Sequence, residues 1–387
     1  MKRIKKDSSY RVVHSLWEWL PVTMSWMYGV LESGENNNIC VLASKLSETN
    51  SNMDIDVIAT KGRMRMLVFK MLMKMGVRVI SSEYKKAIKK YKPDILHSHF
   101  GDRGWLDVAI AKKFNIPQIV SFYGLDVNYL PEKSSAWKLR YRDLFNYASV
   151  VLCLGEHMKH NLMNLGCPTE KLIVHHVGVD VEDIRFQPRK IEDNETIKIL
   201  IASSFREKKG IPFGLRALAV LAKKYPIEIS IIGDSDSDPR SHAEKDRILE
   251  TIAQLKLEDV ITLHGFRTHT ELLNQAYKYH IFLAPSITAK DGDTEGTPVA
   301  IMEMIATGMP VVSTRHSDIP EIIIDKQTGV LAGENNVQEL ADRIVWMIQN
   351  KENWPSMLLN ARKHIENEFN QQMQANKLNE IYKHILH

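Results

Sequence analysis

The segment KDGDTEGTPVAIMEMIATGMPVVST, residues 290–314, carries most of the information about the fold and function of this chain. It contains two glutamates, Glu295 and Glu303, on either side of a predicted helix start. Thr297 is a favourable helix cap, and Pro298 suits the first helical position, where a missing N–H costs nothing. An apolar, helix-forming run follows, and a glycine and a proline then close it before a short buried strand. The segment therefore predicts a loop, a short helix and a strand, with one glutamate in the loop and one in the helix.

The start of this predicted helix is suited to binding a phosphate. The N–H groups of Gly296, Thr297 and the first turn lie at the positive end of the helix dipole, which favours an anion. Carboxylates on both sides would repel a bare phosphate, but they would accept hydrogen bonds from sugar hydroxyls attached to one. The pattern thus predicts a nucleotide-sugar site with one carboxylate for each sugar. The alternative is that Glu303 is a solvated helix residue and Glu295 a loop charge, because short patterns also match by chance.

Length and composition indicate a two-domain globular protein. A chain of 387 residues is too long for one ordinary core, and its 44% hydrophobic and 25% charged residues are typical of soluble proteins. Three cysteines without a C-x-x-C pair indicate a reducing compartment and neither a disulfide framework nor a zinc site. No apolar run is long enough to span a bilayer, and the N-terminal segment lacks a signal-peptide core. We therefore expect a cytoplasmic protein.

Short apolar segments alternate with helical patterns in two successive blocks. The first block contains NICVLAS, DILHSHF, QIVSFYG and SVVLCLG, and the second contains IKILIASS, IEISIIGD, VITLHGF, IFLAPS and PVVST. This alternation predicts the α/β class, with two Rossmann-like parallel-sheet domains. The polar segment 186–196 is the expected linker, so we predict domains at 1–187 and 188–366.

Basic residues are concentrated in the first half of the chain, although the net charge is only +4. The segment TKGRMRMLVFKMLMKMGVRV, residues 60–79, mixes cations with large apolar residues at helical spacing. Such a helix could lie on an anionic membrane surface with its lysines among the headgroups, or it could be a core-facing helix with a solvated basic side. No aromatic-interleaved basic motif accompanies the charge, which argues against a nucleic-acid partner.

Polar residues follow the predicted strands, and parallel sheets bind ligands at the carboxyl ends of their strands. Arg206 and Lys209 precede a predicted helix and could bind a diphosphate. The aspartates of GDSDSDP fail the EF-hand spacing, and the pair His175–His176 lacks a third ligand, so no metal site is expected. Two groups of strand-end residues facing one another would form a cleft between the domains. The other strand-end candidates are Ser204, Gly265 and Phe266 in the second block and His99, Tyr123 and Asp126 in the first.

These motifs resemble the retaining glycosyltransferases of family 4, the group 1 type with the GT-B architecture. Glu295 and Glu303 match the E-x7-E motif, REKKG at 206–210 resembles the donor-phosphate loop, and HHVGVD at 175–180 resembles the segment before the interdomain linker. PDILHSHFG and FYGLDV resemble first-domain strand ends, and DGDTEGTPVAIMEMIATG is similar to members that build bacterial surface polysaccharides. The resemblance implies a GT-B fold, in which a last helix, 367–387, crosses back onto the first domain.

The resemblance also implies roles for single residues. Glu303 would bind the ribose, Glu295 the donor sugar near the reacting carbon, and Lys209 the diphosphate, together with the amides of Gly296 and Thr297. The acceptor would be a saccharide or a lipid-linked saccharide. The remaining residues implied to surround the nucleotide sugar are Gly265 and Phe266 at the base, Asp126 and Tyr123 at the donor sugar, and Pro298, Arg206 and Ser204 in the donor loops.

The reaction that the resemblance implies needs neither cofactor nor metal. Retention in this family is commonly explained by attack from the face that the leaving group departs from, and the departing phosphate oxygen then accepts the acceptor's proton. Cations of the protein and helix-start amides would stabilise the charge that develops on the phosphate. We therefore expect no side-chain general base.

Three departures from the family pattern keep other functions open. The family usually has His where Tyr123 stands and often Arg where Ser204 stands. A glycine-rich turn near the amino end is replaced by WLPVTMSWMYGVL, so Thr23 and Ser25 are acceptor-side candidates together with His99. A nucleotide-sugar epimerase or hydrolase of the same fold, and a binding subunit without turnover, are the alternatives to a transferase.

Overall fold

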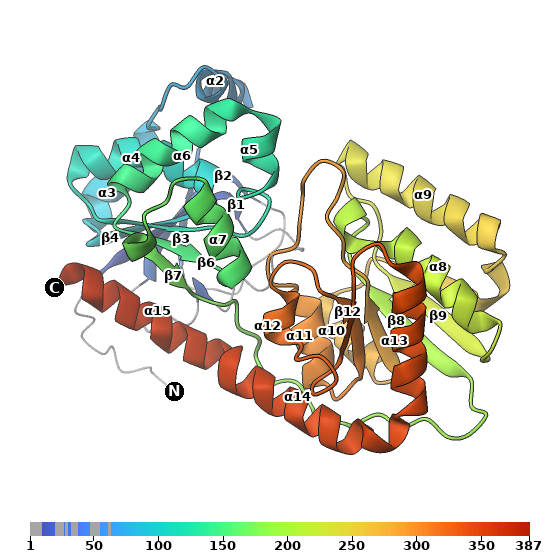
Figure 1. The fold of residues 1–387 in the computed structure, drawn as a ribbon. Coiled ribbons are helices and arrows are strands. Elements are labelled where there is room, and N and C mark those ends of the chain that lie inside the picture. The colour runs from blue at the N-terminus through green and yellow to red at the C-terminus, as the bar shows by residue number, and fades with distance from the viewer. Residues whose placement is uncertain (1–9, 20–26, 28–29, 32–37, 47–54, 61–62) are drawn as a thin grey trace. The chain divides into compact units, whose positions relative to one another are not determined.

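The computed structural model describes residues 10–19, 27, 30–31, 38–46, 55–60 and 63–387, which form two compact α/β units. The first unit comprises Met1–Gly178 and Gln371–His387, and the second comprises Val179–Asn370. Each unit is described by itself below (Figure 1). Within the described part of the chain, every helix is too short or too polar to cross a bilayer.

The first unit contains a seven-stranded parallel sheet with the order β3-β2-β1-β4-β5-β6-β7. Its order reverses between β1 and β4. The strands are β1 (Val12–Trp19), β2 (Asn38–Leu46), β3 (Asp56–Ala59), β4 (Ile95–His99), β5 (Gln118–Ser121), β6 (Val150–Cys153) and β7 (Leu172–Val174).

From β3 onward helices separate these strands, and the C-terminal helix α15 (Gln371–Leu386) belongs to the same unit. It contributes Leu378 and Tyr382 to the apolar cluster that contains Val12 and Ile119. The Tyr382 hydroxyl also bonds Nδ1 of the buried His97 at 2.7 Å. The other helices are α2 (Arg63–Lys74), α3 (Ser82–Tyr91), α4 (Gly101–Phe114), α5 (Tyr129–Lys133), α6 (Ser135–Tyr147) and α7 (Glu156–Asn164).

The second unit contains a six-stranded parallel sheet with the order β10-β9-β8-β11-β12-β13, which reverses between β8 and β11. Its strands are β8 (Ile197–Ala202), β9 (Ile227–Ile232), β10 (Ile261–Gly265), β11 (Ile281–Ala284), β12 (Val311–Thr314) and β13 (Val330–Ala332). Its helices are α8 (Ile211–Ala222), α9 (Pro239–Leu255), α10 (His269–Ala276), α11 (Val299–Ala306), α12 (Ile319–Ile322), α13 (Val337–Gln349) and α14 (Trp354–Glu368).

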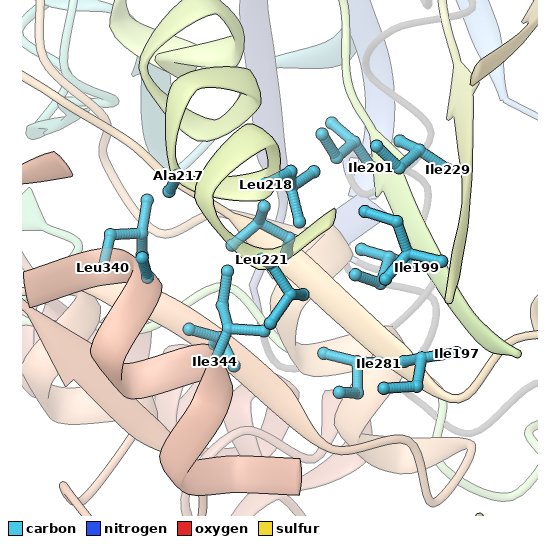
Figure 2. Packing of buried hydrophobic residues seen from close by; sticks show 14 of the residues in the cluster. Ile197, Ile199, Ile201, Ala217, Leu218, Leu221, Ile229, Ile281, Leu340 and Ile344 are labelled. Atoms are coloured by element: carbon cyan, nitrogen blue, oxygen red, sulfur yellow. The ribbon is translucent and has the colours of Figure 1, made fainter. Parts of the chain in front are cut away.

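The core of the second unit explains why its strands consist of nearly continuous apolar runs. Strand β8 is covered on one face by α8 and α13, where Leu218, Leu340 and Ile344 pack with Ile199 (Figure 2). On the other face, Leu200 packs with residues of α11 such as Ile301. A strand buried on both faces has no polar side, which is typical of a parallel sheet between helical layers.

The central strand β1, with the sequence VVHSLWEW, was not predicted. His14 and Ser15 are in fact fully buried, and each has a polar partner. His14 Nδ1 lies 2.9 Å from His99 Nε2, and Ser15 Oγ accepts a hydrogen bond from Arg103. Buried polar groups are tolerated where they are bonded, and the sequence does not show such partners. The short strands β3, β7 and β13 were also missed.

The polar segment 186–196, which we predicted as the linker, folds as part of the second unit. Arg189 is only 5% exposed, and its guanidinium donates to the carbonyl oxygens of Ala276, Tyr279 and Thr307. The chain passes between the units at Gly178–Val179 and again at Asn370–Gln371. The polar composition did not show that one of its charged residues, Arg189, forms buried hydrogen bonds within the second unit.

Candidate active site

A pocket in the second unit opens at the point where the order of the sheet reverses. Its walls come from the ends of β8 and β11 and from the start of α11, and its polar lining includes Lys209 and Glu295. Loops that follow the two strands at a reversal diverge, which leaves a crevice at the carboxyl edge of the sheet. The lining residues are Ile201, Ala202, Ser203, Lys209, Phe282, Leu283, Ala284, Pro285, Ser286, Glu295, Pro298, Ala300 and Ile301.

The turn before α8 holds Lys209 beside the loop that follows β11. Gly210 has a left-handed backbone with φ of +63°, and a Cβ there would lie 1.9 Å from the carbonyl oxygen of Pro285. Only glycine fits both the conformation and the close approach. On the same short segment, the Lys208 carbonyl oxygen accepts a hydrogen bond from the Ile287 amide at 2.9 Å. These contacts fix the two loops against each other.

Lys209 and Glu295 form an ion pair in this pocket, with Nζ 2.5 Å from Oε1. The Glu295 side chain is 6% exposed and that of Lys209 is 22% exposed. Burial by itself would raise the pKa of Glu295, but the charges of Lys209 and Lys208 outweigh it, so the pKa lies below its usual value. The glutamate is therefore held in its charged, hydrogen-bond-accepting form.

The backbone around Glu295 is held by a second set of residues. Its amide donates to His316 Nε2 at 3.0 Å, and its carbonyl oxygen accepts from Ser317 Oγ at 2.8 Å. Because Nε2 accepts a bond, the His316 proton resides on Nδ1, which donates to Glu334 Oε1 at 2.8 Å. This chain from Glu334 through His316 fixes the loop from outside the pocket.

The helix start differs by one residue from the prediction. Pro298 is the N-cap, with an extended ψ of 101°, and α11 begins at Val299. Thr297 is thus not the cap, and the amides of Gly296 and Thr297 lie before the helix. The N–H groups at the dipole end belong to the first turn, Val299 and Ala300. The proline has no N–H to leave unsatisfied, which makes it compatible with the cap position.

Glu303 lies inside α11, where its neighbours along the helix are buried apolar residues. Its Oε1 lies 2.7 Å from His269 Nε2, at the start of α10. This hydrogen bond to Glu303 raises the pKa of His269 above its usual value. The residue is therefore a partnered, largely buried acid and not a solvated helix charge.

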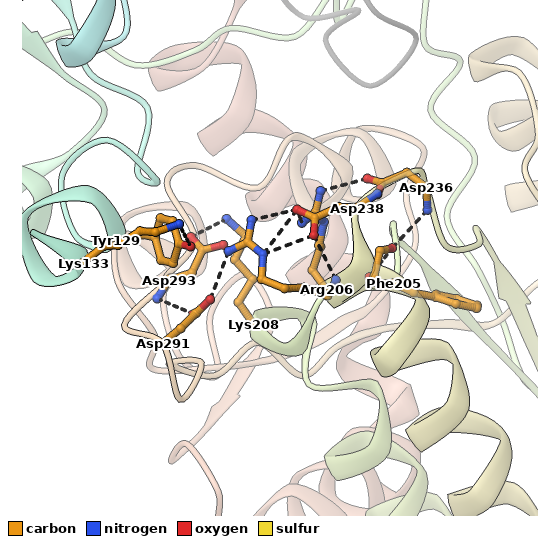
Figure 3. Close-up of polar contacts among 11 residues, drawn as sticks. Tyr129, Lys133, Phe205, Arg206, Lys208, Asp236, Asp238, Asp291 and Asp293 are labelled. Atoms are coloured by element: carbon orange, nitrogen blue, oxygen red, sulfur yellow. Dashed lines mark hydrogen bonds and ion pairs between the residues drawn. The ribbon is translucent and has the colours of Figure 1, made fainter. Parts of the chain in front are cut away.

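Arg206, which we expected at the diphosphate, is not among the residues that line the pocket. Its guanidinium bonds Asp236 at 2.9 Å and Asp238 at 2.6 Å in the loop after β9 (Figure 3). Asp238 also caps α9 and pairs with Arg240, which bonds Asp291 at 3.0 Å in the loop that carries Glu295. Arg206 belongs to a salt-bridge network that joins three loops.

The other predicted residues of this unit lie around the same edge of the sheet. Ser204 is half-buried directly after β8. Gly265 ends β10 with φ of +67°, and its carbonyl oxygen accepts the Gly233 amide at 2.9 Å. Phe266 is 51% exposed, so its ring is accessible to a ligand, and none of these three residues lines the pocket itself.

Asp126 in the first unit, which we expected at the donor sugar, is buried and accepts hydrogen bonds from backbone amides. It is 1% exposed, and its oxygens accept the amides of Gly101 at 2.7 Å and of Tyr123 and Gly124 at 3.0 Å each. Burial raises its pKa to about 6, although these amides oppose the rise. The residue organises the turn after β5.

Three buried histidines, His14, His97 and His99, form a stacked cluster beside this turn. Tyr123 bonds His99 Nδ1 through its hydroxyl at 2.7 Å, and His99 Nε2 lies 2.9 Å from His14 Nδ1. Both ring nitrogens of His97 are also engaged, by Tyr382 and Ser121 at 2.7 Å each. The rings thus bond to one another and to hydroxyls. The acceptor-side candidates Thr23 and Ser25 lie outside the described residues.

Several further residues build the site, and the sequence analysis gave none of them a role of its own. Lys208 bonds Asp293 and the Thr294 carbonyl oxygen, and His316 and His269 support the two glutamates. The sequence offered one signal for a role of Lys208 in the site, namely its position in the loop after a strand. For the histidines, the sequence contains no signal, because their partners are far along the chain.

Comparison with known proteins shows the family of the chain. The profile of "Glycosyl transferases group 1" matches residues 180–368, and that of "Glycosyltransferase Family 4" matches residues 51–183. The amylovoran biosynthesis glycosyltransferase AmsK of Erwinia amylovora is 34% identical over 76% of this chain and 70% of that protein. The chain belongs to the group 1 glycosyltransferases. A putative colanic acid biosynthesis glycosyltransferase, WcaL of Escherichia coli K12, is 31% identical over 76% of this chain and 71% of that protein.

Solved structures show the same architecture as this group 1 glycosyltransferase. Sucrose-phosphate synthase of Thermosynechococcus elongatus has a TM-score of 0.79 at 15% identity, covering 97% of this chain and 99% of that chain. Anabaena HepE in complex with UDP has a TM-score of 0.77 at 16% identity, covering 96% and 99%. These likenesses confirm the GT-B fold predicted from sequence, with its two Rossmann-like parallel-sheet domains.

Proposed function

We propose that this glycosyltransferase transfers a sugar, with retention, from a UDP- or GDP-sugar to a saccharide or lipid-linked acceptor. The convergence of Lys209, Glu295 and the start of α11 on one pocket carries this proposal. A diphosphate fits between an ammonium group and helix-start amides, and a buried carboxylate fits sugar hydroxyls. The solved HepE structures with UDP and UDP-glucose support a donor of this class.

The chemistry follows from where charge develops. When the bond between the anomeric carbon and the phosphate oxygen breaks, negative charge grows on the diphosphate and positive charge on the sugar. Lys209 and the amides of Val299 and Ala300 would stabilise the diphosphate, at typically a few kcal/mol for each well-placed group. The acceptor oxygen bonds the anomeric carbon from the departing side, and its proton passes to the departing phosphate oxygen. No side-chain base is required.

The Lys209–Glu295 pair has a direct consequence for binding. In the protein without donor, Nζ is held by Oε1 at 2.5 Å. The donor would place its diphosphate at the ammonium group and its sugar hydroxyls at the carboxylate, so both charges keep partners. The pair thereby preorganises two adjacent subsites for the two halves of the donor.

Two substitutions test this assignment. Glu303→Ala should lower nucleotide affinity, because it removes the acceptor for the ribose, whereas Glu295→Ala should lower turnover more than affinity. Calorimetric titration with UDP and GDP, followed by release of nucleotide from a panel of their sugars with saccharide acceptors, measures both. Near-normal behaviour of both variants would refute the proposal. Nucleotide release without any acceptor would identify an epimerase or hydrolase, and binding without release would identify a non-catalytic subunit.

The biological role that we propose is the synthesis of a cell-surface polysaccharide. Of the relatives given above, AmsK is named as a glycosyltransferase of amylovoran biosynthesis, and WcaL as a putative glycosyltransferase of colanic acid biosynthesis. Extracts of polysaccharide from cells lacking this chain, analysed for their sugar linkages, should lack one linkage. An unchanged linkage profile would argue against this role.

We also propose that α2 binds an anionic membrane surface, where a lipid-linked acceptor would reside. Leu67, Met71 and Met75 recur every four residues along one side and are 61%, 62% and 73% exposed. Leu139 of α6 is also exposed, and the adjacent Arg140 donates to the Lys74 carbonyl oxygen at 2.9 Å. Helix α2 contains four basic residues and no acidic residue, which favours anionic headgroups.

Vesicle sedimentation tests the membrane proposal. The wild-type protein should bind vesicles that contain phosphatidylglycerol and should bind pure phosphatidylcholine vesicles much less. Met71→Asp should reduce binding at least about fivefold, because it removes buried apolar area and adds a repelled charge. Leu359→Asp is the matched control, since Leu359 is 45% exposed on α14. Equal binding by both variants would refute the role of α2.

A further inference from the structure

His269 and Glu303 form a pair whose second carboxylate oxygen is unused. Glu303 Oε1 lies 2.7 Å from His269 Nε2, whereas Oε2 has no hydrogen-bond partner among the residues that the structure describes. The Glu303 side chain is 11% exposed and that of His269 is 48% exposed. The acid is therefore nearly buried, and its histidine partner is more exposed than the acid itself.

The backbone of α10 fixes where His269 lies. It is the first residue of the helix, directly after Thr268, which forms a reciprocal capping box with Glu271. A capping box sets the start and direction of a helix. Because α10 and α11 contact each other, the imidazole is brought to Glu303 by two fixed backbones and not by a mobile loop.

We propose that His269 is a positioning residue for ribose recognition, which holds Oε1 of Glu303 so that Oε2 faces the vicinal hydroxyls of the nucleotide. The inference rests on the proposed function and adds a residue that the family motif does not contain. A glutamate side chain has three rotatable bonds, and without a partner it would have to lose that freedom when ligand binds. Because the histidine orders the Glu303 side chain before the nucleotide binds, less conformational entropy is lost on binding. A larger part of the free energy of the carboxylate–hydroxyl hydrogen bonds then contributes to affinity.

The role differs from simple structural support in one measurable respect. If His269 acts through Glu303 on the ribose, its removal should weaken binding only of ligands that carry ribose hydroxyls. If it merely supports the fold, its removal should weaken binding of every nucleotide. A nucleotide without the 2′ and 3′ hydroxyls separates these cases, because it keeps the base and the diphosphate.

The experiment is calorimetric titration with UDP, GDP and their 2′,3′-dideoxy counterparts. Wild type should prefer the ribonucleotide about tenfold or more, since a hydrogen bond to a charged group contributes about 1.5–3 kcal/mol. His269→Ala should reduce ribonucleotide affinity about five- to tenfold and leave dideoxynucleotide affinity unchanged. His269→Gln, whose amide nitrogen can reach Oε1, should recover most of the preference. His242→Ala, an exposed histidine of α9, is the matched control.

The outcomes distinguish this inference from the proposed function. If wild type prefers the ribonucleotide and His269→Ala retains that preference, the positioning role is wrong and the donor assignment stands. An equal loss for both kinds of nucleotide would show a structural role and would also overturn the inference. If wild type binds neither UDP nor GDP, the proposed donor is wrong and the inference fails with it. Thermal unfolding of each variant confirms that it is folded.

Discussion

Replacing Lys209 by methionine tests the energetics on which the proposed site depends. The substitution keeps most of the side-chain volume and removes the ammonium group that lies 2.5 Å from Glu295 Oε1. The carboxylate would then remain 6% exposed without its main partner. Breaking a buried ion pair from one side costs about 3–5 kcal/mol. Because the charge of Lys208 remains nearby and also lowers the pKa of Glu295, we expect the lower value, about 3 kcal/mol.

A double-mutant cycle separates the pair from the effect of each side chain. Glu295→Gln removes the buried charge, and the 22% exposed Lys209 can then turn toward water, so this variant should lose only about 1 kcal/mol. The double variant Lys209→Met/Glu295→Gln leaves no unpaired charge and should also lose about 1 kcal/mol. The resulting coupling energy of about 3 kcal/mol is measured by calorimetric unfolding, resolved into the transitions of the two units. Additive losses would refute the idea that the pair is energetically coupled.

The pH dependence supplies an independent check on the same variant. In wild type, the lowered pKa of Glu295 contributes stability above about pH 4.5 that is lost as the pH falls through the folded value. Lys209→Met removes the leading cause that lowers this pKa, so protonation becomes easy in the folded variant. The deficit should therefore be largest near pH 8 and should shrink toward pH 5. A deficit of the same size at both pH values would show that methionine disturbs packing and not charge.

Three further predictions follow from the contacts above. Gly210→Ala should destabilise the second unit by at least about 2 kcal/mol, because φ is +63° and the new Cβ would meet the Pro285 carbonyl oxygen; unchanged unfolding would contradict this. Arg206→Met should cost about 1 kcal/mol and leave UDP or GDP affinity within about twofold in calorimetric titration, since Arg206 bonds aspartates outside the pocket. The first unit should lose stability in acid, because burial lowers the pKa of three histidines, to about 4 for one of them, and each must gain a proton on unfolding as the pH falls from about 6.5. Burial raises the pKa of Asp126 to about 6 and also raises that of Asp102, which offsets part of this loss; a flat thermal-unfolding profile between about pH 6 and 4 would refute the prediction. The histidines are His97, His99 and His175.

The sequence by itself determined the architecture and the central motif. Apolar runs separated by helical patterns predicted two parallel-sheet domains, because a strand that is buried on both faces consists of nearly continuous apolar residues. The segment around Glu295 and Glu303 predicted the loop, helix and strand, since capping and closing residues act within one turn of the backbone. Glycine before α8 likewise marked Lys209 as a residue at a constrained turn. These are local properties, which depend on residues that lie close together in the sequence.

Only the tertiary structure decided which charges are partners. His269 reaches Glu303 across 34 residues, and His316 reaches the Glu295 amide across 21. Arg206 looked suited to a phosphate, but two aspartates in the loop after the neighbouring strand hold it instead. His14 and Ser15 of β1 are buried because they bond to segments far along the chain. The burial and the hydrogen bonds of a polar side chain depend on which strands are neighbours in the sheet. The amino-acid sequence does not show the order of the strands.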